Sequence, residues 1–219
     1  MQIIHTGFSA TQGFHFANAF ALPLGGLARD AFIYGLCGGM CFAALDYYYG
    51  GQFIPPLTEA PPTGSPLYRF LLRRQIDSVS QPSVLPRLGL WMLARNEHVA
   101  AWTVGVQVPR ILYALDRGEP VVLIVLRDIS RDDEDRRPYA RRRGPASPFI
   151  NHQVVATGYG RDDLGRLTIN LYDPNHPNIE PTFVTTETED GLRVLQSTGE
   201  PVRGFFAQPY RPMKVPGTF

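Results

Sequence analysis

Cysteine is scarce in this chain, with only Cys37 and Cys41 among 219 residues. On a helix their spacing would place both thiols on one face, one turn apart, where disulfide geometry is poor. Small secreted domains that depend on disulfides are far richer in cysteine. The sequence therefore excludes a disulfide-stapled scaffold and leaves two free thiols whose roles have to be explained.

Charge of one sign and long apolar runs are lacking too. Lys and Arg number 21 against 20 Asp and Glu, for a net charge of +1, so no basic excess indicates a nucleic-acid partner. The basic residues at 136–143 have acidic neighbours at 132–135, which is typical of a solvated loop. No apolar stretch approaches bilayer-spanning length, and residues 1–7 lack the regions of a signal peptide. We therefore expect no membrane insertion and a cytoplasmic protein by default, with leaderless export left open.

The apolar pattern changes near residue 119. Before that point, helical periodicity predicts helices at 38–49, from 66 onward, at 84–96 and at 109–117. In the helix that starts at Pro66, Arg74 falls on the polar side. After residue 119, apolar runs and alternation predict strands at 120–126, 152–159, 167–172, 182–186, 192–195 and 204–207. The sum is a single α+β domain over 1–219, with a helical part of about 1–118 and a β-rich part of about 119–219.

Cys37 stands where the first turn of a predicted helix begins. Backbone N–H groups without intrahelical partners and the helix dipole stabilise a thiolate at such a position, and the thiolate is the nucleophile. Gly38 and Gly39 follow directly and would leave the thiol open to a substrate carbonyl. The alternative is a small buried apolar residue, as free cysteine often is. Glycine is poor inside a helix, which argues against a simple packing role.

A histidine and a carboxylate follow on two neighbouring predicted strands. His152 begins the first strand, and Asp173 ends the second after a turn at 162–165. A hairpin brings such residues into side-chain contact, so Asp173 could fix the tautomer of His152. The alternatives are a hydrogen-bonded structural histidine, plain turn chemistry at Asp173, and His176 as a rival base. Cysteine, histidine and acid in this order indicate a thiol hydrolase.

These motifs resemble the papain-like cysteine peptidase superfamily, and most closely its C39 peptidase-like group. The segment 37–50 resembles the C39 catalytic helix, which opens on C-G-x-x-C and ends in Tyr-Tyr-Gly. The segment 152–160 resembles the base strand of papain-like enzymes, and 171–174 resembles the C39 strand that ends in Asp-Pro. The resemblance implies a papain-like fold, in which an N-terminal helical half with the catalytic helix packs on a C-terminal antiparallel β-sheet. It also implies that Cys37 is the nucleophile, His152 the base and Asp173 its orienting group.

Two points of the resemblance stay open. Papain places an aromatic residue and alanine after its nucleophile, which would select Cys41, although Cys41 lies one turn inside the helix. The group also carries a glutamine about six residues before the nucleophile, as oxyanion donor, where this chain has Ala31. Gln12 or Asn18 could supply that donor from the N-terminal segment.

The favoured function is therefore cleavage of a peptide or other amide bond through an acyl-enzyme on Cys37. An acyltransferase or transglutaminase-like enzyme with the same triad is one alternative, and an inactive papain-like binding module is another. The expected partner is a peptide or protein substrate. No cofactor is expected, no metal-site spacing stands out, and the sequence leaves the oligomeric state open.

Overall fold

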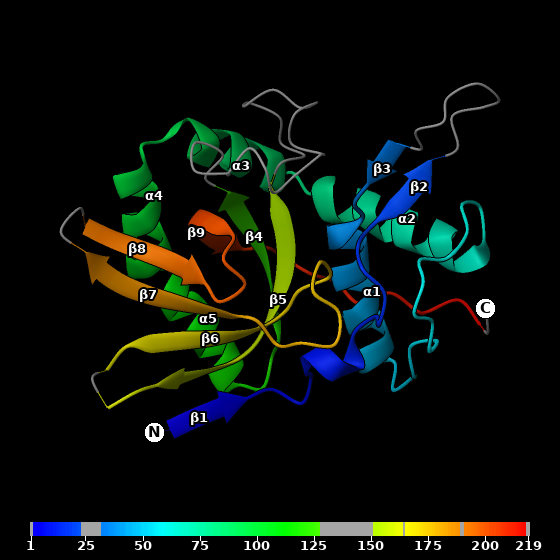
Figure 1. Cartoon of the computed structure of the whole chain (residues 1–219), viewed down its shortest axis with the longest axis horizontal. Helices are drawn as coiled ribbons and strands as arrows, with labels where there is room; N and C mark the ends of the chain where they lie inside the picture. Colours follow the sequence, from blue (N-terminus) through cyan, green and yellow to red (C-terminus); the bar gives the residue numbers. More distant parts are fainter. Residues whose placement is uncertain (1, 23–31, 128–150, 164, 189–190, 218–219) are drawn as a thin grey trace.

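Helices come first along this chain and most of the strands follow. The computed structural model describes residues 2–22, 32–127, 151–163, 165–188 and 191–217 (Figure 1). The predictions for Ala31 and for the basic cluster at 136–143 concern residues outside these ranges. The N-terminal segment contributes short elements, namely β1 (Gln2–His5), the 3₁₀ turn η1 (Ala10–Gln12), β2 (Phe20–Leu22) and β3 (Phe32–Tyr34).

The predicted helices are present, with one addition. They are α1 (Cys37–Tyr49), α2 (Pro66–Val79), α3 (Val84–Leu93) and α5 (Val108–Asp116). Ser65 caps α2, because its Oγ accepts a hydrogen bond from Tyr68 N at 3.2 Å, and Pro66 suits the first turn. The predicted helix at 84–96 ends early, and α4 (Asn96–Trp102) and the π-helical segment η2 (Thr103–Gln107) lead on into α5.

Six strands of the second half form a closed antiparallel barrel. They are β4 (Val121–Arg127), β5 (His152–Arg161), β6 (Leu167–Tyr172), β7 (Thr182–Thr188), β8 (Gly191–Gln196) and β9 (Pro201–Ala207). Their order is β5-β4-β9-β8-β7-β6, and β6 pairs again with β5. Residues 152–156 of β5 pair with β4, and residues 158–161 pair with β1. Since β6 covers the other edge of β5, strand β1 takes over the edge that β4 leaves.

The prediction of a papain-like fold is therefore wrong. It placed a helical half on an open antiparallel sheet, whereas here each strand from β4 to β9 pairs with the next along the chain, and the pairing of β9 with β4 closes the sheet on itself. The predicted strands are present at almost the expected residues. The error lies in their pairing, because the partner of a strand is set by contacts between residues far apart in the sequence.

Three buried apolar clusters hold these elements together. The inward side chains of the barrel strands pack with one face of α5, and the outer face of β4 and β9 packs on α3. The third cluster joins α1 to α2, to the N-terminal segment and to Val122 and Val155 on the outside of the barrel. Helix α1 is thus a buried element that lies beside the barrel (Figure 1).

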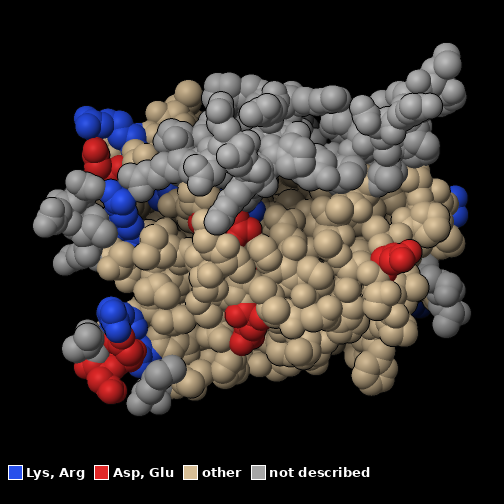
Figure 2. Space-filling model, in the orientation of Figure 1, with Lys and Arg blue, Asp and Glu red and all other residues tan. Residues whose placement is uncertain are grey.

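The surface agrees with the balanced charge of the sequence. On the face seen in Figure 2, described acidic and basic side chains are few, and they lie side by side mainly at its left edge. Among the described residues, no helix combines the length and the apolar character that crossing a bilayer requires.

Candidate active site

Cys37 is the first residue of α1 and is half-buried. The helix start has no side-chain cap from the residue before it. The Gly38 N–H lies against the Cys37 sulfur instead, and the Gly39 N–H donates to Gln75 Oε1 at 2.9 Å. The thiol therefore occupies the site where free N–H groups and the helix dipole favour negative charge, as the sequence indicated.

Close packing of α1 against its neighbours explains why residues 38 and 39 are both glycine. A Cβ at Gly38 would overlap Gln153 Oε1, and a Cβ at Gly39 would overlap the carbonyl oxygen of Leu71 in α2. A larger residue at Gly39 would push α1 away from α2, and one at Gly38 would displace the Gln153 and Ser78 side chains. The pair therefore lets the helix that carries Cys37 approach the barrel and α2 closely, and its role as an opening toward substrate stays a prediction.

His152 and Asp173 meet at the end of the barrel that lies beside the start of α1. His152 Nε2 lies 2.6 Å from Asp173 Oδ1, and the two side chains are 4% and 0% exposed. The same carboxylate oxygen accepts a hydrogen bond from Asn175 N at 2.8 Å, an Asx turn. Both sequence readings of Asp173 therefore hold, since the residue shapes the turn and also orients the imidazole.

Strand register explains why these groups converge. Side chains two residues apart on a strand lie on the same face. His152 therefore lies on the same face of β5 as Val154, which points into the barrel. By the same alternation, Asp173 lies on the face of Leu171 at the end of β6, and Gln196 lies on the face of Val194 on β8. Gln196 Nε2 donates to Asp173 Oδ2 at 3.0 Å. Gln196 was not predicted from the sequence, although its position on a predicted strand, two residues after a valine that points inward, was the available signal.

Electrostatics at the site favour an ion pair between Cys37 and His152. Nε2 of His152 faces Asp173, so Nδ1 is the nitrogen left for its hydrogen bond with the Cys37 thiol. Burial raises the pKa of Cys37, but the hydrogen bond and charge of His152 outweigh it, and the pKa lies below the ordinary 9.0. Burial lowers the pKa of His152, but the charge and hydrogen bond of Asp173 outweigh burial. The pKa therefore lies above the ordinary 6.5, at about 9.

The two proposed oxyanion donors differ in where they lie. Asn18 Oδ1 accepts from Leu36 N at 2.5 Å, directly before Cys37, and Asn18 Nδ2 donates to Asn175 Oδ1 at 3.0 Å. It thus links the turn after Asp173 to the start of α1. Gln12 is exposed and accepts from Ser9 N at 2.8 Å within the η1 turn, away from these contacts.

The remaining alternatives have other roles in the structure. Cys41 is fully buried in the core, its Sγ donates to Gln153 O at 3.4 Å, and burial raises the pKa of its thiol well above the ordinary value. The rival base, His176, is paired with Glu200 Oε1 at 2.5 Å. The geometry therefore assembles Cys37, His152 and Asp173, and it leaves Cys41 and His176 outside this triad.

Comparison of the chain with protein-family models, with curated proteins and with solved structures finds no match. Within the described ranges, no group of three or more His, Cys, Asp or Glu side chains is arranged to hold a metal ion. The chemistry of the site therefore has to be argued from its own residues.

Proposed function

We propose that this protein is a thiol hydrolase that cleaves a peptide or another amide bond through an acyl-enzyme on Cys37. The observation that carries the proposal is the continuous contact from the Cys37 thiol through the His152 imidazole to the buried Asp173 carboxylate. Such a nucleophile, base and orienting group define covalent acyl-transfer catalysis. The motif resemblance to C39-type peptidases falls on these same residues, although the architecture around them differs from the one it implied.

The first half of the proposed reaction uses the ion pair. The Cys37 thiolate attacks the substrate carbonyl carbon, a C–S bond forms, and the carbonyl oxygen takes the negative charge. As the C–N bond breaks, protonated His152 gives its proton to the leaving amine. The proposed oxyanion donors are the backbone N–H of Cys37 and the second amide hydrogen of Asn18 Nδ2, and the bond from Leu36 N, directly before Cys37, to Asn18 Oδ1 supports this choice.

The second half releases the acyl group. Water attacks the thioester carbon while neutral His152 takes its proton, and the C–S bond then breaks to return the Cys37 thiolate and the protonated imidazole. Asp173 keeps Nε2–H in place throughout and stays ionised, because the charge and hydrogen bond of His152 outweigh the effect of burial and lower the pKa of this carboxyl. An amine in place of water would give the acyltransferase or transglutaminase-like outcome from the same intermediate.

Alkylation by iodoacetamide as a function of pH tests the nucleophile. We expect Cys37 to react faster at neutral pH than a model thiol, with the rate rising through a pKa below 9.0. Peptide mass spectrometry separates Cys37 from Cys41, which serves as an internal control because it is fully buried. In His152→Ala the rise should move upward in pH, since the hydrogen bond and charge that lower the thiol pKa are lost.

The proposal would be contradicted, and a non-catalytic binding module favoured, if Cys37 reacts no faster than a model thiol and His152→Ala leaves its rate unchanged.

Cleavage is tested in a second experiment with a complex peptide mixture, with Cys37→Ala as the control. New peptide termini that form only with the unaltered protein support hydrolysis. Products that carry an added amine would instead identify acyl transfer.

A further inference from the structure

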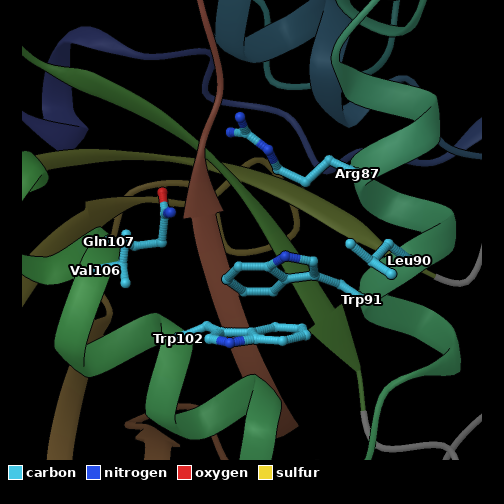
Figure 3. Close-up of a pocket in the computed structure, with 6 residues that line it drawn as sticks. All are labelled: Arg87, Leu90, Trp91, Trp102, Val106 and Gln107. Atoms are coloured by element: carbon cyan, nitrogen blue, oxygen red, sulfur yellow. The ribbon is translucent and has the colours of Figure 1, made fainter.

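A pocket lies between α3 and η2, on the outer side of β9 (Figure 3). It shares no residue with the proposed triad. It is a shallow hollow, open to solvent, with a volume of about 200 Å³. Its lining consists of two indoles, two aliphatic side chains, an amide and a guanidinium, from Trp91, Trp102, Leu90, Val106, Gln107 and Arg87. The indole rings lie 5.6 Å apart between centroids and form an aromatic wall. No acidic side chain is among the lining residues.

Gln107 brings a polar group with unused capacity into this apolar setting. The side chain is 5% exposed, and its Oε1 accepts a hydrogen bond from Ala207 N at 3.1 Å. Within the described part of the chain, Nε2 has no acceptor, and it is not one of the fully buried donors that lack a partner. Figure 3 shows the amide on the same side of the two indoles as Arg87.

The π-helical segment η2 holds Gln107 in this position. Thr103 Oγ1 accepts from Phe205 N at 3.1 Å, so Thr103 and Gln107 together bind the edge of β9 that β8 leaves uncovered. This contact accounts for the Gln107 oxygen and fixes the amide plane. The two N–H groups on Nε2 are not needed for it, and π-helical turns of this kind often occur at functional sites.

Arg87 adds a positive charge at the same opening. Its guanidinium lies 5.5 Å from the centroid of the Phe206 ring and is half-buried. Among the residues that the structure describes, no carboxylate pairs with it. An aromatic wall, the Gln107 amide and the Arg87 guanidinium therefore line one mainly apolar pocket, and its described lining residues include no carboxylate.

We propose that this pocket binds a monocarboxylate with an aromatic or branched apolar body, about the size of one amino acid. The carboxylate oxygens would accept from the Arg87 guanidinium and from Gln107 Nε2, in the charge-assisted geometry that guanidinium groups favour. The apolar body would pack on Trp91 and Trp102. Both a free small acid and the carboxyl terminus of a peptide carry this chemistry.

Tryptophan fluorescence tests the proposal directly, because the chain has only two tryptophans and both line the pocket. Titration with N-acetyl-L-phenylalanine should give a saturable change on excitation of the indoles. The matched amide, which lacks the carboxylate, should bind at least about tenfold more weakly. Short peptides that end in phenylalanine, with free or amidated carboxyl termini, distinguish a peptide terminus from a free acid. Equal binding of acid and amide, or no saturable change with either, would overturn the proposal without any variant.

Two variants sharpen the assignment. Gln107→Glu keeps an oxygen for Ala207 N but replaces the donor by a negative charge, and Arg87→Gln removes the guanidinium. Each should weaken the acid at least about tenfold and leave the amide almost unchanged. Arg73→Gln, an exposed position on α2, is the matched control and should bind like the unaltered protein. Binding of the acid should also be unchanged after alkylation of Cys37. Weaker binding in the Gln107 and Arg87 variants is therefore distinguishable from failure of the proposed hydrolase.

Discussion

Two buried ion pairs lie beside α1, and they differ in what surrounds them. At the start of the helix His152 and Asp173 approach to 2.6 Å, and in its second half Asp46 and Arg74 approach to 2.7 Å. The four side chains are all no more than 4% exposed. By distance and burial alone the two pairs are equivalent.

The Asp46–Arg74 pair is closed by the C-terminal segment of the described chain. Asp46 Oδ1 accepts from Tyr210 OH at 2.7 Å and from Met213 N at 2.8 Å. Arg74 donates to Arg211 O at 2.9 Å. These contacts hold residues 210–213 against α1 and α2, with both side chains of the pair buried.

The His152–Asp173 pair is next to a half-buried thiol instead. A buried ion pair with shifted pKa values is compatible with a structural or a chemical role. The presence of Cys37, with its lowered pKa, is the feature that separates the two. We therefore interpret the first pair as a candidate active site and the second as a clamp, so substitutions should affect reactivity in one and stability in the other.

The largest effect on chemistry is expected from Asp173→Asn. The charge that raises the pKa of His152 to about 9 is lost, and the amide can also hold the wrong tautomer. Turnover of a cleaved peptide should fall roughly 10³- to 10⁴-fold. In the unaltered protein the rate should rise as Cys37 loses its proton below pH 9.0 and fall as His152 loses its own near pH 9.

The pH profile of Asp173→Asn is the decisive measurement. With the imidazolium less favoured, the pKa of Cys37 rises, so the acid limb should move to higher pH. Asp163→Asn, in an exposed turn, is the matched control and should keep the original profile. If the Asp173→Asn protein folds and keeps the rate and pH profile of the unaltered protein, the His152–Asp173 pair has a structural role like that of Asp46–Arg74.

Arg74→Met should have the largest effect on stability. It leaves the buried Asp46 carboxylate without its cation, which costs about 3–5 kcal/mol of unfolding free energy. Adding Asp46→Asn should recover part of the loss, because the amide oxygen can still accept from Tyr210 and Met213. Urea unfolding measures both changes.

Arg73→Met on the same helix, an exposed position, should change stability by less than about 0.5 kcal/mol. The folded Arg74→Met protein should alkylate at Cys37 at the unaltered rate. A clear change in that rate would show that the two ion pairs are coupled and would break the comparison.

Asn18→Asp should have an intermediate effect on turnover. The carboxylate can still accept from Leu36 N, but it lacks the amide hydrogens and adds negative charge where the oxyanion forms. A loss of roughly 10²- to 10³-fold in turnover is expected. Alkylation of Cys37 by iodoacetamide forms no oxyanion, so it should change much less. Equal losses in both assays would indicate that Asn18 only positions the chain.

The contact of Cys37, His152 and Asp173 could be predicted from sequence because its signals are local. A thiol at a helix start and an acid at the end of a hairpin strand depend on residues near them in the chain, and α1 and β6 occur at nearly the predicted positions. Barrel closure could not be predicted in this way, because it needs β9 to pair with β4 from across some eighty residues of chain.

Arg74 and η2 illustrate the same limit. Arg74 was predicted on the polar face of its helix, but it is buried because Asp46, on another helix, compensates its charge. The segment 96–107 was missed because Gly105 and β-branched residues disfavour a helix. It is held by hydrogen bonds that Thr103 and Gln107 accept from backbone N–H groups of β9, which sequence periodicity does not reveal.

The smallest effect is expected from Cys41→Ala. This thiol lies on the same helix as Cys37, one turn further in, and papain's motif would select it as the nucleophile. Its sulfur is fully buried, and burial with the charges of Cys37 and Asp173 raises the pKa of its thiol. Alanine should therefore cost about 1 kcal/mol of stability through a small cavity and leave turnover and Cys37 alkylation unchanged. Loss of turnover in Cys41→Ala, with Cys37→Ala still active, would reverse the assignment of the nucleophile; the opposite result would show that a helix start, more than the surrounding motif, decides which thiol reacts.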